Sequence, residues 1–181
     1  MDKSKLSYRI PSREDALQLL VKSGCEKNVI EHCKTVSQLA VKIAKKLKNN
    51  GFNVDLRLVE IGALLHDIGR SKTHTVHHAI IGANIAREAG LPEAIIRIIE
   101  RHVGGGITSQ EARKLGWPVR DYIPETLEEK IVCYADKLIE GNRQVPIERT
   151  IEKLAAELGE NHPAIERIKR LHKEFMSMVD I

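Results

Sequence analysis

Apolar residues recur at intervals of three and four along most of this 181-residue chain, a spacing that is typical of amphipathic helices. The clearest stripe lies in residues 27–49 and consists of Val29, Cys33, Val36, Ala40, Ile43 and Leu47. No stretch alternates apolar and polar residues for long enough to form a regular strand. The pattern therefore predicts an all-α fold, a single-domain bundle of about nine helices.

Capping residues, glycines and prolines mark the ends of these helices. Thr108 with Glu111, and Thr126 with Glu129, have the spacing of capping boxes. The predicted helices cover about residues 12–23, 27–49, 55–66, 76–89, 92–103, 108–116, 126–139, 147–158 and 163–179. We expect one domain over residues 1–181, with a core at 28–142 and a C-terminal helical hairpin at 143–181 packed on it.

The composition argues against two classes of protein. Three cysteines without a C-x-x-C spacing do not make a disulfide framework, and they favour a reducing compartment. No apolar run reaches the roughly 18 residues of a membrane span, so we expect a cytoplasmic protein with no membrane partner. The net charge of +4 fits an anionic partner such as a nucleotide. It fits a solvated surface rich in both charges equally well.

Five histidines and aspartates fall on the apolar faces of five different predicted helices, and a sixth residue, Asp67, follows His66 at the end of its helix. They are His32, His66, Asp67, His78, His102 and Asp136. Burying a carboxylate or an imidazole without a partner costs free energy. A single buried histidine is usually a hydrogen-bonded core residue, but six such groups on five helices are best explained if they converge on metal.

The order of these residues, His32, then His66-Asp67, then Asp136, resembles the HD-domain superfamily of metal-dependent phosphohydrolases over about residues 28–142. "HDIG" at residues 66–69 and "YADKL" around Asp136 carry the resemblance, and "HDIG" is typical of one large subgroup. "HAIIGA" from His78 and "ERHVGGG" around His102 resemble the elements that add two histidines in the binuclear branches. The layout is most similar to small stand-alone archaeal-type members. The GYP-type sequence of the cyclic-di-GMP enzymes is absent, which argues against that substrate.

The resemblance implies a phosphohydrolase or phosphodiesterase that cleaves a nucleotide or a related small phosphate ester with a metal-activated water. It implies two divalent ions per chain (Mn, Fe, Co, Ni or Zn, with Mg as an alternative) that share Asp67. His32, His66 and Asp136 would serve one ion, and His78 and His102 the other. Asp67 would also orient the attacking water.

Several residues close to these ligands in the sequence are candidates for contact with the substrate. Arg70 and Lys72 follow the HD pair and, with Asp67, are the predicted catalytic residues. The predicted substrate-binding residues are Arg70, Lys72, His74, His77, Gly104, Gly105 and Arg143. The alternative for each is an ordinary surface residue or helix terminator.

Two other functions remain open at this stage. One is a non-catalytic module that binds a nucleotide or RNA, which the basic charge would suit. The other is a di-iron oxygenase, because the family uses the same ligands and scaffold for both chemistries. The sequence also leaves open the substrate, the metal and a homodimer formed through the terminal hairpin.

Overall fold

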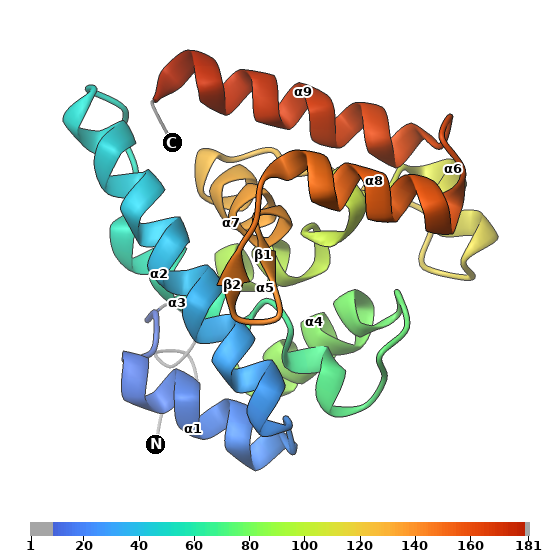
Figure 1. Cartoon of the computed structure of the whole chain (residues 1–181). Helices are drawn as coiled ribbons and strands as arrows, with labels where there is room; N and C mark the ends of the chain where they lie inside the picture. Colours follow the sequence, from blue (N-terminus) through green and yellow to red (C-terminus); the bar gives the residue numbers. More distant parts are fainter. Residues whose placement is uncertain (1–8, 180–181) are drawn as a thin grey trace.

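The computed structural model describes residues 9–179, and nine α-helices account for most of them (Figure 1). This confirms the predicted all-α fold; residues 1–8 and 180–181 of the expected domain lie outside the described part. The helices are α1 (Arg13–Ser23), α2 (Lys27–Asn49), α3 (Leu56–Leu65), α4 (His78–Glu88), α5 (Glu93–Glu100), α6 (Ser109–Lys114), α7 (Leu127–Lys137), α8 (Ile147–Leu158) and α9 (Pro163–Met178). Two short 3₁₀ helices are η2 (Ile68–Ser71) and η3 (Val103–Gly105). None of the described helices combines the length and apolarity that crossing a bilayer needs.

The prediction of a helix over residues 126–139 is wrong at its end. Helix α7 ends at Lys137, and an antiparallel hairpin follows, formed by β1 (Ile139–Glu140) and β2 (Arg143–Gln144). Its two-residue turn begins with Gly141 at φ +62°, and hairpin turns favour glycine at such positions. Strands of two residues are too short to show an alternating pattern in the sequence.

The two predicted capping boxes differ in the structure. The first is confirmed, because Thr108 and Glu111 exchange hydrogen bonds in both directions. At the second, Thr126 accepts from the backbone N–H of Glu129, but the Glu129 carboxylate does not return to Thr126. It accepts instead from the backbone N–H of Glu125 and pairs with Arg101 at 3.0 Å. A buried guanidinium is a stronger partner for this carboxylate than a backbone amide.

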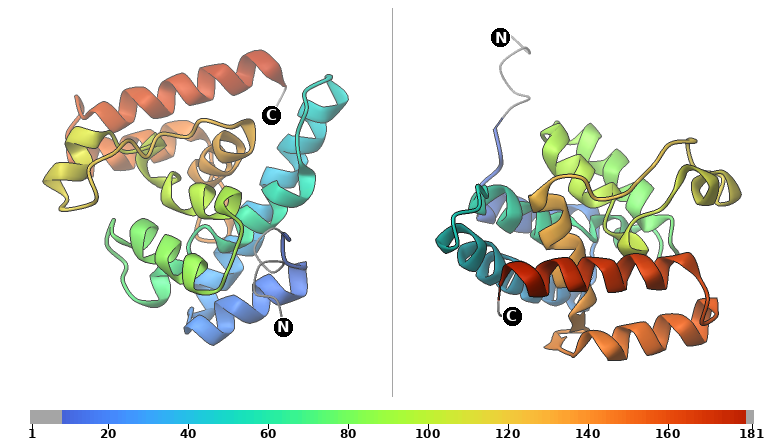
Figure 2. Two further views of the ribbon diagram at one scale, coloured as in Figure 1. Left: turned by 180° about the vertical axis from the view of Figure 1, so that it is seen from behind. Right: turned by 90° about the horizontal axis from the view of Figure 1, so that it is seen from above.

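Helix α2 joins two hydrophobic clusters. Its first half packs Val29 and Cys33 with α1, α3, α4 and α5, and its second half packs against α7 and α9. Helices α8 and α9 run antiparallel beside each other (Figure 2). Helix α9 contributes Ile168 and Phe175 to the cluster around the second half of α2. Residues 143–179 therefore have no separate core. Only Ile147 of α8 is fully buried, which leaves α8 at the edge of the bundle.

Two glycines let η2 and α4 approach each other. A Cβ built on Gly69 would lie 1.9 Å from the carbonyl oxygen of His78 and 2.7 Å from the backbone nitrogen of Gly82. A Cβ on Gly82 would in turn lie 3.0 Å from the nitrogen of Gly69. The last glycine of "HDIG" is therefore needed for packing, because it allows His78 to begin α4 directly beside Asp67.

We expect Gly69→Ala to destabilise the protein by about 2 to 3 kcal/mol, because the added methyl group meets backbone that cannot move independently. Chemical denaturation measures this change. Gly62→Ala is the comparison, since the nearest neighbours of its methyl group would be side-chain atoms of Ile98 and not backbone. An equal loss of stability in both variants would show that the contact between η2 and α4 is not special.

Candidate metal centre

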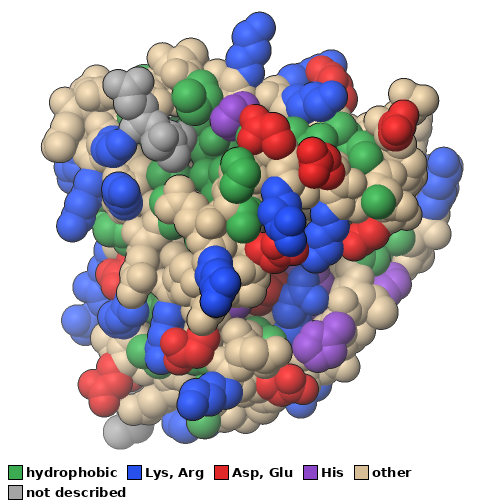
Figure 3. Space-filling model, viewed as in Figure 1, with side chains coloured by type: hydrophobic (Ala, Val, Ile, Leu, Met, Phe, Trp, Pro, Cys, Tyr) green, Lys and Arg blue, Asp and Glu red, His purple; other side chains and the backbone are tan. Residues whose placement is uncertain are grey.

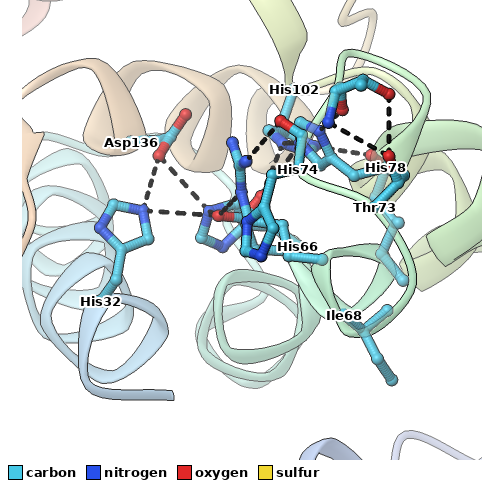
Figure 4. A network of polar contacts seen from close by, with 12 residues as sticks. His32, His66, Ile68, Thr73, His74, His78, His102 and Asp136 are labelled. Carbon is cyan, nitrogen blue, oxygen red and sulfur yellow. Dashed lines mark hydrogen bonds and ion pairs between the residues drawn. The ribbon is translucent and has the colours of Figure 1, made fainter. Parts of the chain in front are cut away.

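The structure brings the six predicted ligands together from five parts of the fold. His32 lies in the second turn of α2, His66 and Asp67 follow α3, and His78 begins α4. His102 follows α5, and Asp136 lies in the last turn of α7. Three overlapping groups of these residues have ligand atoms within 4.8 Å of one another: His32, His66 and Asp67; His66, His102 and Asp136; Asp67, His78 and His102. The labelled side chains of these four histidines and Asp136 converge in Figure 4.

Asp67 lies between two pairs of histidines. Its Oδ1 is 3.1 Å from His78 Nε2 and 3.4 Å from His102 Nε2. Its Oδ2 is 3.8 Å from His32 Nε2 and 3.7 Å from His66 Nε2. Within 4 Å, the Oδ1 atom of Asp136 approaches the second pair, at 3.0 and 3.4 Å. The donor atoms thus form two sets that share one carboxylate.

Backbone carbonyls orient all four imidazole rings. The Nδ1 atoms of His66, His78 and His102 each lie 2.7 Å from the carbonyl oxygen three residues earlier in the chain. His32 Nδ1 lies 2.6 Å from the carbonyl of Gly141 in the hairpin turn. A carbonyl can only accept, so each Nδ1 carries a proton and each ring turns its Nε2 toward the carboxylates of Asp67 and Asp136. Histidines that bind metals are held in this way.

Several buried atoms of the cluster lack partners among the described residues. His66 Nε2 and Asp67 Oδ1 make no hydrogen bond there. His78 Nε2 and His102 Nε2 face each other at 3.0 Å, although both Nδ1 protons are given to carbonyls. Burial, with the nearby His66 and His78, lowers the pKa of His102 to about 4, so this ring is neutral at neutral pH. Facing lone pairs and an unpaired buried oxygen are satisfied by a cation, and this nitrogen and oxygen donor set fits a divalent metal.

Both carboxylates are ionised and available as ligands. Burial would raise the pKa of Asp67, but His66, His102 and His78 together hold it well below its ordinary value. For Asp136, Lys137 and the rings of His32 and His66 likewise outweigh burial and lower the pKa. The cluster therefore keeps two negative charges in its interior at neutral pH.

A cavity of about 630 Å³ opens onto the cluster. Of the predicted substrate contacts, Arg70, His74 and Gly104 line it. Arg70 donates through Nε to Asp67 Oδ2 at 2.7 Å and through Nη1 to the carbonyl of His74. Side chains of both charges and histidine gather around the middle of the face shown in Figure 3.

The other four predicted contacts do not line this cavity. His77 accepts a hydrogen bond from Trp117 Nε1 at 2.8 Å, outside the cluster. Gly105 is buried against Arg167 and Ile168 of α9, and Lys72 and Arg143 are exposed. Their contact with a substrate stays a prediction.

Three cations that sequence reasoning missed line the cavity: Lys137, Arg149 and Lys153. The buried ammonium of Lys137 donates to Asp136 Oδ2 at 2.6 Å and to the carbonyl of His102 at 3.1 Å. It thereby joins residues from the two donor sets and leaves Asp136 Oδ1 facing the histidines. In the sequence, the position of Lys137 directly after Asp136 was the one indication that it belongs to this site. No local signal pointed to Arg149 or Lys153, because the hairpin brings α8 to the cavity.

The sequence and the fold are similar to those of known proteins. Residues 29–141 match the family model described as HD domain. The uncharacterized protein MJ0778 of Methanocaldococcus jannaschii is 50% identical over 166 residues, which are 92% of this chain and 98% of that protein. A tRNA (cytidine(56)-2'-O)-methyltransferase of Picrophilus torridus is 43% identical over 178 residues, which are 98% of this chain. The chain spans only 50% of the length of that methyltransferase.

A solved structure shares the fold. The HD domain of the L. monocytogenes phosphodiesterase PgpH, crystallised with cyclic-di-AMP, superposes with a TM-score of 0.56 at 18% identity. The superposition covers 90% of this chain and 94% of that one. Because the family model matches more than half of the sequence, and because the bundle has the same fold as the PgpH domain, the chain belongs to the HD-domain family.

Proposed function

We propose that this protein is a metal-dependent phosphohydrolase that cleaves a phosphate ester of a nucleotide or an RNA. The observation that carries the proposal is the set of unpaired Nε2 and carboxylate atoms around Asp67, next to a cavity lined by cations. Such a set holds divalent ions well and has no evident structural purpose without them. Membership of the HD-domain family supports the same conclusion.

We assign the donor atoms to two divalent ions that share Asp67. His32, His66 and Asp136 would hold one ion, and His78 and His102 the other. Bound divalent ions supply an activated water and stabilise negative charge on phosphoryl oxygens. The nitrogen and oxygen ligands suit Mn, Fe, Co, Ni or Zn.

The protein itself would position the substrate through charge. Arg70, Lys137, Arg149 and Lys153 line the cavity together with four carboxylates, those of Asp67, Asp136, Glu140 and Glu157. These eight charges cancel when the histidines are neutral, so two divalent ions would leave the cavity with a charge of +4. Arg70 keeps unused guanidinium N–H groups at the cavity wall, where they can donate to a phosphate oxygen.

RNA is a candidate substrate because of the methyltransferase relative. In the Picrophilus protein, the part similar to this chain is about half of a molecule named for its action on tRNA. The cyclic-di-AMP bound by the PgpH domain supports a nucleotide more generally. The similarity to the methyltransferase would suit a non-catalytic RNA-binding module equally well, but such a module would not need the cluster of metal-binding side chains.

We expect purified protein supplied with Mn²⁺, Fe²⁺, Co²⁺ or Ni²⁺ to hydrolyse bis(p-nitrophenyl) phosphate and members of a panel of nucleotides and short RNAs. Asp67→Asn should lower the rate at least about a hundredfold, because the amide loses the charge that both ions share. Release of p-nitrophenol and chromatography of the nucleotides measure the rates. Asp121→Asn, an exposed aspartate outside the cavity, is the control. If no substrate were hydrolysed with any of these metals, the hydrolase would be contradicted, and the binding module or the oxygenase would be the better hypothesis.

Protein purified without chelators should contain two metal ions per chain, and His102→Ala should lower the content toward one, because only the Oδ1 side of Asp67 loses a ligand. Elemental analysis by mass spectrometry measures the content. His77→Ala, which removes a neighbouring imidazole that hydrogen bonds to Trp117 instead, should leave the content unchanged. Equal losses in both variants, or a parent protein without metal, would contradict the assignment of His102.

A further inference from the structure

Helix α8 turns one face toward the cavity. Its lining residues are Arg149, Thr150, Lys153, Leu154 and Glu157, which recur with the helical period. Arg149 and Lys153 are one turn apart, a rise of about 6 Å along the axis. The two cations therefore form a short positive stripe on the wall contributed by α8.

The hairpin fixes this stripe relative to the metal ligands. Arg149 Nε and Lys153 Nζ lie 2.6 and 3.7 Å from the two oxygens of Glu140. Glu140 precedes Gly141, whose carbonyl orients the ring of His32. The carboxylate of Glu140 neutralises one of the two cations and leaves a net charge of +1 for the three side chains. The exposed fractions of the Arg149 and Lys153 side chains are 62% and 61%. These cations are thus tethered and still open to a ligand.

We propose that Arg149 and Lys153 form a second anion subsite, which binds a phosphate other than the one that reacts. This inference rests on the proposed function, because it places the reacting phosphate at the Asp67 cluster. The substrate class is then a nucleotide chain with at least two phosphates, such as a dinucleotide or the end of an RNA. Glu157, one turn beyond Lys153, limits the positive stripe on its far side.

The rest of the cavity wall supports recognition through phosphates. No Phe, Tyr or Trp is among the described residues that line the cavity, so these residues offer no such ring for stacking a base. Its apolar residues are Val29, Val103, Ile139 and Leu154. Charge-assisted contacts to phosphate are therefore the strongest interactions that this cavity offers a nucleotide chain.

The test compares the affinities of two probes, AMP and the dinucleotide pApA with a hydrolysis-resistant phosphorothioate linkage, measured by calorimetry on the metal-loaded protein. The parent should bind pApA about tenfold more tightly than AMP, because only pApA reaches both subsites. In the double variant Arg149→Ala/Lys153→Ala this ratio should fall below about threefold. The charge-matched control is Arg170→Ala/Lys173→Ala on the exposed face of α9, where Arg170 pairs with Glu166 as Arg149 pairs with Glu140. The control should keep the parent's ratio.

Equal affinities for the two probes in the parent, or a ratio that persists in the α8 variant, would overturn the subsite. A loss of the ratio in the α9 control as well would also overturn it, because a general charge effect would then explain the preference. Hydrolysis of bis(p-nitrophenyl) phosphate by the parent is measured separately. Absence of turnover together with the expected ratios would defeat the proposed hydrolase and retain the subsite.

Discussion

The hydrogen bonds from four Nδ1 atoms to backbone carbonyls are the constraint on which the site depends. Each bond fixes a ring and turns its Nε2 toward the carboxylates of Asp67 and Asp136, so that four Nε2 atoms meet around them. For His66, His78 and His102 the acceptor is the carbonyl three residues earlier, at the end or the beginning of a helix. The last turns of α3 and α5 leave such carbonyls without helical partners, and His66 and His102 use them. The acceptor of His78 is Thr75, which precedes α4 and also accepts from the backbone N–H of His78.

His32 is oriented differently from the other three. It lies within α2, where the backbone carbonyls are engaged in the helix, and its acceptor Gly141 is more than a hundred residues away. The hairpin that carries Gly141 also carries Glu140, the partner of Arg149 and Lys153. One short turn therefore connects His32, a proposed metal ligand, with the wall of the cavity and α8. The close contact of Gly69 and Gly82 between η2 and α4 likewise positions His78 beside Asp67.

Helical periodicity made the all-α fold and most helix boundaries predictable. It also placed His32, His66, His78, His102 and Asp136 on apolar faces, because a polar residue inside an apolar stripe is visible without knowledge of tertiary contacts. Asp67 was predicted because it follows His66. The hairpin was missed because its strands are too short for a pattern. Arg149 and Lys153 were missed because their approach to the cavity depends on that hairpin. His77, by contrast, is next to the proposed ligand His78 in sequence but turns toward Trp117.

The most direct test of the central claim is a crystal structure of the Mn²⁺-loaded protein with anomalous diffraction data. Two anomalous peaks are expected, one on each side of Asp67, each within bonding distance of the histidine nitrogens of its own set. One peak should contact His32 and His66, and the other His78 and His102. A single peak on the His32 side would reduce the centre to one metal, and no peak near Asp67 would contradict a metal-dependent reaction at this cluster.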